Sequence, residues 1–249
     1  MKKDVSVQFD HILQKASFLE RPNRFLLRCM MPADCDDLCT LTGEEIVEAH
    51  LADPGRLKEL LVPGRPIWLR PVNKVGRKTK WSAVLCESPA GDSLVSLDST
   101  LPNRLIGRAL AVGAMTEFHG WSLVRPEFPL GGSRWDFLLK NSAGRRLLLE
   151  VKSVTLMEEK VALFPDALTA RGAKHMRELA QIVRHGEYEA AVLFVVQRDE
   201  AECIRAAPHI DPVFAAALAD AREAGVGVYG RKCIISLTGV TLAGSLPAG

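Results

Sequence analysis

The sequence predicts two domains, a small β-barrel in the N-terminal part of the chain and an α/β domain in the C-terminal part. Residues 24–97 contain short apolar segments separated by Gly, Pro and Asp turns, which is typical of a barrel or a sandwich. From residue 102 onward, strand-like and helix-like segments follow one another, which is typical of an α/β domain. We place the boundary near residue 100, with residues 1–100 in the first domain and residues 101–249 in the second.

The composition is that of an ordinary folded protein with a sizeable core. The chain has 249 residues, of which 47% are hydrophobic and 25% are charged. Its formal net charge is only +2, so a nucleic-acid partner has to be argued from local basic patches. The N-terminus lacks the apolar segment of a secretory signal, and no run of about 18 apolar residues is present to span a membrane. We therefore expect a cytoplasmic protein without a membrane partner, and the sequence leaves its oligomeric state open.

The six cysteines have two interpretations. In the cytoplasm, reduced thiols with a structural role are expected. The alternative is a zinc site at Cys35 and Cys39, with Cys29 before them and His50 after them, because the Cys-x-x-x-Cys spacing is within the range that zinc accepts. No second closely spaced pair follows, and we therefore favour structural thiols.

The N-terminal domain begins with an extension, residues 1–17. We expect the first two dozen residues, up to Arg21-Pro22-Asn23, to be weakly structured or helical. Short strands follow, with one short helix expected at Gly55–Leu61 between the second and the third of them. A small closed barrel with one intervening helix is the arrangement of an OB-fold. The predicted strands are Arg24–Met31, Glu45–Leu51, Pro66–Val72, Lys80–Glu87 and Leu94–Leu97.

The C-terminal domain begins with a helix, because Pro102 suits the first turn of one. Thr169–Arg184 is predicted as a second helix, and Asp211-Pro212 is an N-cap and first-turn pair for a third, which runs to Glu223. The continuous apolar run Ala190–Gln197 is typical of a strand that is buried on both faces. The other predicted strands are Ser122–Phe128, Arg134–Lys140, Arg146–Val154 and Val226–Leu237.

Three charged residues in the middle strands carry the sharpest functional signal. Glu150 and Lys152 end an apolar strand and, being two residues apart, project from the same face. Charged side chains are rarely buried unless they are paired or bind a ligand. Asp136 lies on the neighbouring strand and can meet Glu150 across the ladder. Two adjacent carboxylates repel each other, and Mg²⁺ or Mn²⁺ would relieve that repulsion.

These residues suggest a site for phosphodiester chemistry. Asp136 and Glu150 are the candidate metal ligands, and Lys152 is a candidate for orienting the attacking water or neutralising transition-state charge. The alternative is a buried salt bridge without chemistry. The order of helix, three strands, helix and strand favours the first interpretation, because it is the core of the PD-(D/E)xK nucleases, the restriction-endonuclease-like fold. Gln197, at the end of the buried strand, is a further catalytic candidate.

Glu127 and Glu117 are further carboxylate candidates for the same cleft, although each also suits a plain surface position. The helix over residues 169–184 adds a basic face that includes His175 and Arg177 and suits phosphate contacts, while a solvated face is the alternative.

A basic stretch from Arg56 to Trp81 is the predicted nucleic-acid-binding surface of the barrel. It contains eight Lys or Arg residues and a single acid, Glu59. Clustered cations bind phosphates through counterion release, and aromatic rings stack on bases. A solvated basic edge with core tryptophans is the alternative. The predicted nucleic-acid contacts in the two domains are Arg56, Arg77, Lys78, Lys80, Trp81, Arg134, Arg171 and Lys174.

Short sequence blocks spread from about residue 18 to residue 240 carry a family resemblance. They are Arg21–Phe25, Glu48–Arg56, Arg77–Trp81, Ser99–Leu105, Ser133–Phe137, Leu149–Leu156, Ala162–Ala167, Arg171-Gly172 and Phe194–Arg198. In this order they resemble the sugar fermentation stimulation protein A family. The resemblance implies an OB-like domain joined to a nuclease-like domain, DNA binding, and a regulatory link to sugar (maltose) metabolism. It also carries the nuclease triad onto Asp136, Glu150 and Lys152.

Two functions remain open at this point. One is a Mg²⁺- or Mn²⁺-dependent nuclease whose barrel holds the strand, and the intact triad favours it. The other is a sequence-nonspecific DNA-binding regulator of sugar metabolism that uses the nuclease fold as a scaffold without cutting. A carbohydrate enzyme finds no support, because the sequence has no further paired-carboxylate site and no phosphate-binding glycine loop. DNA is favoured over RNA as the partner, and the number of strands bound stays open.

Overall fold

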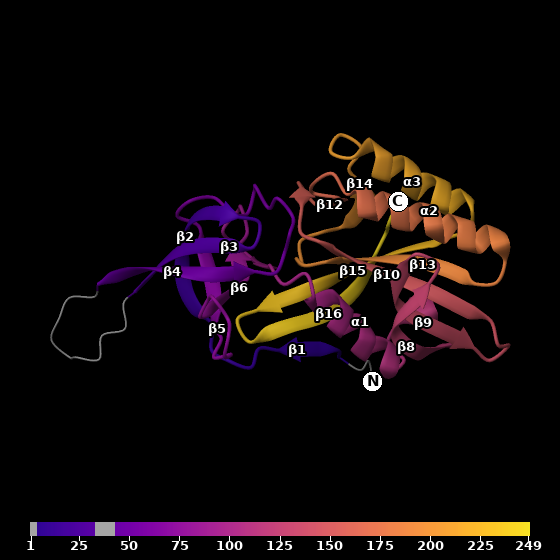
Figure 1. Ribbon diagram of the computed structural model, residues 1–249, viewed down its shortest axis with the longest axis horizontal. Helices are drawn as coiled ribbons and strands as arrows, with labels where there is room; N and C mark the ends of the chain where they lie inside the picture. The colour runs from indigo at the N-terminus through magenta and orange to yellow at the C-terminus, as the bar shows by residue number, and fades with distance from the viewer. Residues whose placement is uncertain (1–3, 33–42) are drawn as a thin grey trace. The chain divides into compact units, whose positions relative to one another are not determined.

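The computed structural model describes residues 4–32 and 43–249 (Figure 1). The described chain forms two compact units, and each of them draws on both ends of the sequence. The N-terminal unit contains residues 8–99 and 235–239, and the C-terminal unit contains the residues up to Val7, residues 100–234 and residues 240–249. No helix in these described ranges is long and apolar enough to cross a membrane.

The N-terminal unit is an OB-type barrel, as the sequence predicted. Its strands pair in the order β4-β3-β2-β5-β6-β7, and a parallel pairing of β4 with β6 closes the barrel. Leu27, Leu51 and Leu69 belong to its buried interior, where alternate residues of each strand point inward. The strands are β2 (Gln14–Asn23), β3 (Leu26–Pro32), β4 (Glu44–Leu51), β5 (Pro66–Pro71), β6 (Trp81–Glu87) and β7 (Leu94–Ser96).

The start of the chain corrects one prediction. The first two dozen residues, up to Arg21-Pro22-Asn23, were expected to be weakly structured or helical, but β1 (Ser6–Gln8) and β2 (Gln14–Asn23) are strands. β1 lies at the edge of the C-terminal sheet beside β16 (Gly239–Leu246), at the far end of the sequence. A partner so distant leaves no local pattern in the sequence.

The helix expected at Gly55–Leu61 is also wrong. This segment consists of turns, in which the amides of Leu60 and Leu61 donate to the carbonyl of Leu57 at 3.1 and 2.8 Å. Leu57 has a φ of 50°, in the left-handed region, which ends any helical run. Leu57 and Leu60 are both buried in the barrel core, so their helix-like spacing reflects the packing of a turn.

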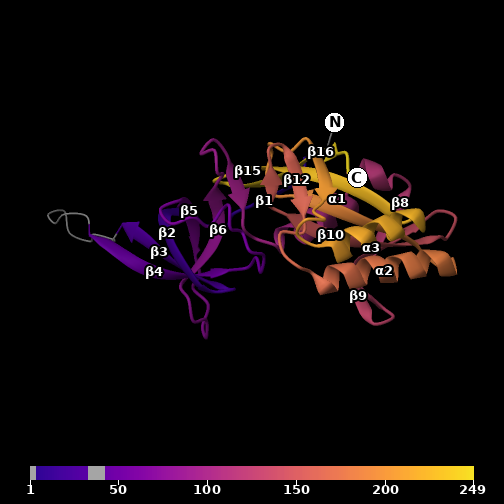
Figure 2. The same cartoon turned by 90° about the horizontal axis from the view of Figure 1, so that it is seen from above.

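The C-terminal unit has the restriction-endonuclease-like α/β fold. Its sheet has the order β1-β16-β15-β13-β10-β9-β8, in which β10, β13 and β15 run parallel and β8, β9 and β10 run antiparallel. α2 and α3 cover one face of the sheet and α1 lies on the other (Figure 1 and Figure 2). The elements are α1 (Leu101–Ala111), β8 (Trp121–Leu130), β9 (Ser133–Asn141), β10 (Arg146–Val154), α2 (Ala170–His185), β13 (Glu189–Val196), α3 (Pro212–Glu223) and β15 (Gly227–Ser236).

The two covering helices begin with side-chain caps. The Oγ1 of Thr169 accepts from the amide of Gly172 at 3.0 Å, and Asp211 accepts from the amide of Phe214 at 2.9 Å. Asp211 thereby fills the N-cap role that the sequence predicted. α2 ends at Gly186, whose φ of 80° suits glycine at a helix C-terminus. These caps fix where α2 starts and therefore which of its residues face the sheet.

Some elements of the C-terminal unit were not predicted. The strand expected at Val226–Leu237 corresponds to β15, but it is not the last strand of the chain. β16 follows it as the second strand of a hairpin that reverses after Ser236, whose Oγ accepts from the amide of Gly239 at 3.2 Å. A small separate sheet has the order β11-β12-β14. The remaining elements are η1 (Thr116–Phe118), β11 (Met157–Glu158), β12 (Val161–Phe164) and β14 (Cys203–Ala206).

Candidate active site

β9 and β10 separate at the point where the predicted acidic residues lie. Their ladder ends with the pair Phe137–Leu149, and the next pair in register would be Asp136 and Glu150. Instead, Oδ2 of Asp136 accepts a hydrogen bond from the main-chain amide of Val151 at 2.7 Å. A hydrogen bond to a side chain thus takes the place of main-chain pairing between β9 and β10. This bond holds Asp136 beside the end of β10.

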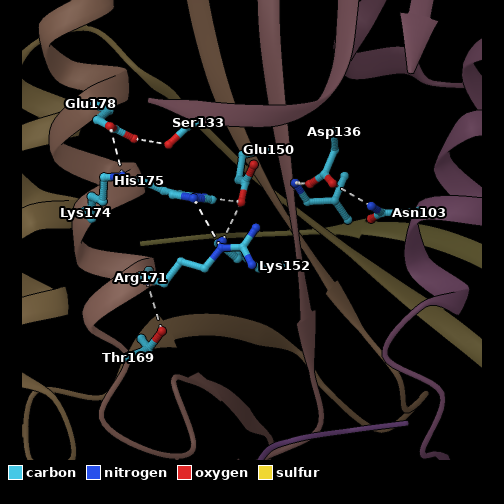
Figure 3. Close-up of polar contacts among 12 residues, drawn as sticks. Asn103, Ser133, Asp136, Glu150, Lys152, Thr169, Arg171, Lys174, His175 and Glu178 are labelled. Carbon is cyan, nitrogen blue, oxygen red and sulfur yellow. Dashed lines mark hydrogen bonds and ion pairs between the residues drawn. The ribbon is translucent and has the colours of Figure 1, made fainter. Parts of the chain in front are cut away.

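Asp136 is held in an environment that disfavours its charge. Its Oδ1 accepts a hydrogen bond from Nδ2 of Asn103, on α1, at 2.6 Å (Figure 3). Burial and, second, the negative charge of Glu150 raise the pKa of Asp136 to about 6, although Asn103, the Val151 amide and Lys152 act in the opposite direction. Asp136 therefore carries its charge under repulsion at neutral pH.

Glu150 is buried, with only 4% of its surface exposed. Its Oε1 lies 2.6 Å from Nζ of Lys152 and 2.6 Å from Nδ1 of His175 (Figure 3). Burial acts to raise the pKa of Glu150, but the hydrogen bond from His175 and the charge of Lys152 outweigh it, so the pKa lies below its ordinary value. Glu150 is therefore ionised at neutral pH. Its Oε2 is also buried but has no hydrogen-bond partner among the described residues.

His175 is the residue that the sequence analysis placed wrongly. It was assigned to the basic face of its helix, yet it is buried against the sheet, with its ring 5.4 Å from that of Trp135. Nε of Arg171 lies 3.4 Å from Nε2 of His175, so Nε2 is the acceptor and Nδ1 carries the proton that points to Glu150. The signal was present, because His175 shares the buried stripe of α2 with Met176 and Leu179.

Asn103 was also missed as a site residue. It sits in the first turns of α1, and nothing in the local sequence distinguishes it from a solvated polar residue. Its block, Ser99–Leu105, was noticed only as part of the family resemblance.

Gln197, the fourth predicted catalytic residue, lies directly after β13 and is fully buried. Its Nε2 donates to Oγ of Ser153 at 3.3 Å, and its amide donates to the carbonyl of Val154 at 2.8 Å. Lys152 pairs with Phe194 in the parallel ladder, and Gln197 lies three residues after Phe194. The structure thus places it next to the segment that follows Lys152.

The basic residues of this unit that were predicted to contact nucleic acid are all exposed, but they have different partners. Arg134 is exposed and pairs with Glu127 at 3.6 Å, and Lys174 is exposed and pairs with Glu178 at 3.6 Å. Glu178 also accepts a hydrogen bond from Ser133 (Figure 3). Arg171 is exposed and reaches the acidic residues through its contact with His175.

The two further carboxylate candidates have other partners. Glu127 is exposed in its pair with Arg134. Glu117 is half-buried and accepts two hydrogen bonds from Arg231, each of 2.7 Å. Glu117 is therefore committed to a salt bridge and not to the site.

The predicted contacts of the barrel differ in exposure. Arg56, Lys78 and Lys80 are exposed. Arg77 is half-buried, and its Nη2 donates to Oγ of Ser82 at 2.7 Å. Trp81 is half-buried and packs against the barrel core, so part of its ring has a structural role.

Two of the four residues of the zinc alternative, Cys29 and His50, lie among the described residues. Cys29 is buried inside the barrel, and burial raises the pKa of its thiol to about 12, which disfavours the thiolate that zinc requires. Cys35 and Cys39 lie outside the described residues. The described cysteines are free thiols, namely Cys29, Cys86, Cys203 and Cys233.

The fold and the site together define an OB-type barrel joined to a restriction-endonuclease-like domain. Two family models match the chain accordingly. The model described as "Sugar fermentation stimulation protein RE domain" matches residues 100–239, and the model described as "SfsA N-terminal OB domain" matches residues 19–97. The chain belongs to the sugar fermentation stimulation protein family.

Similar proteins cover nearly the whole chain. The sugar fermentation stimulation protein homolog of Shouchella clausii is 45% identical over 235 residues, which cover 94% of this chain and 97% of that one. The homolog of Moorella thermoacetica is 42% identical over 231 residues, which cover 92% and 94%. Among solved structures, Pyrococcus furiosus SfsA in complex with Ca²⁺ superposes with a TM-score of 0.84 at 26% identity, covering 99% of each chain.

Proposed function

We propose that this protein binds DNA and hydrolyses phosphodiester bonds at Asp136, Glu150 and Lys152, with Mg²⁺ or Mn²⁺ as its cofactor. The observation that carries the proposal is the unequal hydrogen bonding of the two carboxylate oxygens of Glu150. One of its oxygens is engaged by both Lys152 and His175, while the other is buried without a hydrogen-bond partner among the described residues. An unsatisfied buried acceptor costs about 1–3 kcal/mol, and a ligand would remove that cost.

The donor set fits a hard divalent cation. Burial and the charge of Glu150 raise the pKa of Asp136, which shows that Lys152 does not fully offset the repulsion between the two carboxylates. A divalent cation would offset it. The described residues contain no group of three or more His, Cys, Asp or Glu side chains suited to hold a metal. Mg²⁺ is commonly bound by one or two carboxylates, with water and phosphate oxygens completing its shell. The Pyrococcus furiosus relative was solved in complex with Ca²⁺, another hard divalent cation, and this supports the proposal.

Each residue then has a defined task. Asp136 and Glu150 would hold the cation, which supplies Lewis acidity and a more acidic water when bound. Lys152 keeps its ammonium group 2.6 Å from Glu150 and would donate to a phosphate oxygen as negative charge builds up there. Asn103 and the Val151 amide hold both oxygens of Asp136, so this carboxylate is oriented before substrate arrives.

A second function is favoured by one specific observation. Lys152 and His175 already pair with Oε1 of Glu150, and these contacts need no substrate. Such an arrangement is stable as a scaffold, and it would suit a non-catalytic, sequence-nonspecific DNA-binding regulator of sugar (maltose) metabolism.

An assay with a metal series separates the two functions. Labelled single- and double-stranded DNA and RNA are incubated with Mg²⁺, Mn²⁺ or EDTA and with wild type, Glu150→Gln, Lys152→Ala or Lys140→Ala. Lys140 is exposed on β9 and serves as the matched control for Lys152. We expect metal-dependent cleavage that both site variants lose and Lys140→Ala keeps. Binding without cleavage, equal in all four proteins, would leave the scaffold function. Cleavage that persists in Glu150→Gln would place the chemistry elsewhere.

A further inference from the structure

An exposed aromatic pair lies on the N-terminal barrel. Phe25 directly precedes β3 and is 48% exposed. Its ring is stacked on that of His50, on β4, with the ring centroids 6.5 Å apart and the planes inclined by 9°. The carbonyl of Phe25 accepts from the amide of Leu51 at 2.9 Å, so the backbone under the ring is anchored to the barrel. A large apolar ring is therefore held facing solvent.

His50 contributes a flat and uncharged face to this pair. Burial and, second, the positive charge of Arg77 lower the pKa of His50, and the charge of Asp98 only partly opposes them. The imidazole is therefore neutral at neutral pH, and Phe25 and His50 together form a continuous aromatic surface.

One arginine holds basic residues beside this surface. The guanidinium group of Arg21 donates to the carbonyl of Arg24 at 2.6 Å, to that of Gly55 at 2.6 Å and to that of Arg56 at 3.0 Å. Asp53 tightens the same turn by accepting from the amide of Gly55 at 2.7 Å. The side chains of Arg24 and Arg56, both exposed, are thus carried by backbone that a single guanidinium group ties together.

A third cation lies in the segment that connects β5 to β6. Arg77 donates to Oγ of Ser82, and Ser82 is the partner of His50 in the β4–β6 ladder. Three segments that are far apart in the sequence, around Arg21, His50 and Arg77, therefore meet at the aromatic pair. Arginine guanidinium groups beside an exposed aromatic ring suit a nucleic acid, whose phosphates bind cations and whose bases stack on rings.

We propose that Phe25 and His50 form a stacking platform for a base of single-stranded nucleic acid, flanked by Arg24, Arg56 and Arg77 as phosphate contacts. The inference rests on the proposed nucleic-acid binding and names the form of the ligand. Base faces are covered in a duplex and become accessible to aromatic rings only in single strands or splayed-out bases. The sequence analysis assigned stacking to Trp81, but Phe25 is the better candidate because Trp81 packs against the core.

Binding of labelled oligonucleotides to the full-length chain, measured by fluorescence anisotropy in EDTA, tests the platform. The probes are a thymidine homopolymer, the uridine equivalent and a mixed-sequence duplex. We expect Phe25→Ala to bind the single strands about 10-fold more weakly than wild type, and Phe25→Tyr to bind them like wild type. Ile46→Ala is the matched control, since Ile46 is 61% exposed on the same strand as His50 and about 13 Å away along it.

A further probe is a single-stranded oligonucleotide with abasic sites, which lacks the bases but keeps the phosphates. On this probe we expect Phe25→Ala and wild type to bind equally, because the platform has nothing to stack on. Equal loss on the normal and abasic strands would overturn the platform, as would a Phe25→Ala variant that binds the normal strand like Ile46→Ala. Failure of the wild type to bind any probe would instead overturn the proposed nucleic-acid binding itself. The thymidine and uridine arms decide between DNA and RNA as the source of the strand.

Discussion

Nδ1 of His175 lies 2.6 Å from Oε1 of Glu150, and this contact joins α2 to the charged end of β10. Both side chains are buried, at 4% and 5% exposure. Since Arg171 faces the other nitrogen, the ring donates one directed hydrogen bond to a buried carboxylate. Metal-binding carboxylates need such outer partners to fix their orientation. His175 is therefore a positioning residue for Glu150 in the proposed site.

The first prediction removes this donor. We expect His175→Leu to lower the free energy of unfolding by about 1–3 kcal/mol, because it leaves a buried carboxylate oxygen with one partner fewer. We also expect Mn²⁺ affinity to fall by about 10-fold or more. His175→Asn keeps an N–H near the position of Nδ1 and should retain most of both properties. Urea unfolding of the metal-free protein and calorimetric titration with Mn²⁺ measure the two effects. If the Leu and Asn variants behave alike, His175 only fills space.

The second prediction concerns Asp136 and pH. Its folded-state pKa of about 6 lies above the ordinary value of 3.8, so the folded protein binds this proton more tightly than the unfolded chain. The resulting stabilisation is fully present below about pH 4 and is lost as the pH rises through 6. We expect Asp136→Asn, which cannot ionise, to gain on the order of 1–2 kcal/mol relative to wild type between pH 4 and pH 7.5.

Thermal or urea unfolding in EDTA across this pH range gives the difference between the two proteins. The sign of its slope is the test, because Asn also changes the hydrogen bonds to Asn103 and the Val151 amide by an offset that does not depend on pH. A flat difference, or one that favours wild type more as the pH rises, would contradict the raised pKa. Added Mg²⁺ should stabilise wild type but not Asp136→Asn if the proposed cation binds there.

Much of the C-terminal fold was predictable because its signals are local. The predicted strand Ala190–Gln197 is apolar up to Val196 because β13 is buried between β10 and β15. Asp211 caps α3 through a hydrogen bond to a residue three positions away. The sequence did not predict β1, because its partner, β16, lies at the other end of the chain. The prediction of a helix around Leu57 was wrong, because its leucines are spaced like those on a helix face although they are buried by the packing of the barrel.

The residues of the candidate site likewise fall into those with a local sequence signal and those that depend on tertiary packing. Asp136, Glu150 and Lys152 stood out because charge is unusual at the end of an apolar strand. Their partners did not stand out, since Asn103 and His175 become site residues only through packing of α1 and α2 against the sheet. Phe25 belongs to one of the sequence blocks that carry the family resemblance, and its exposure on the barrel depends on tertiary structure that no local pattern encodes.

The third prediction compares two salt bridges. Arg231 and Glu117 pair through two contacts, with side chains 11% and 10% exposed, and Arg231 also donates to the carbonyl of Ala243 at 2.9 Å. Arg231→Met should cost about 3–5 kcal/mol, because it leaves a buried charge without its counterion. Arg184 and Asp220 pair at 2.7 Å but are 51% and 47% exposed, so Arg184→Met should cost less than about 1 kcal/mol. Urea unfolding of both variants measures the contrast. Equal losses would mean that burial does not set the strength of these pairs.

The fourth prediction separates two basic residues that are adjacent in the chain. Lys78 is exposed, whereas Arg77 is half-buried and donates to Ser82 beside His50. If both contact phosphates, each substitution to Ala should reduce the slope of log Kd against log salt by about 1. Only Arg77→Ala should also lower the melting temperature, because only Arg77 braces the barrel through Ser82. Salt titrations of oligonucleotide binding, combined with thermal unfolding, give both quantities. A Lys78→Ala variant with an unchanged slope would remove Lys78 from the binding surface. If Arg77→Ala changes stability but not the slope, Arg77 is structural, and Arg24 and Arg56 remain as the cations beside the aromatic pair.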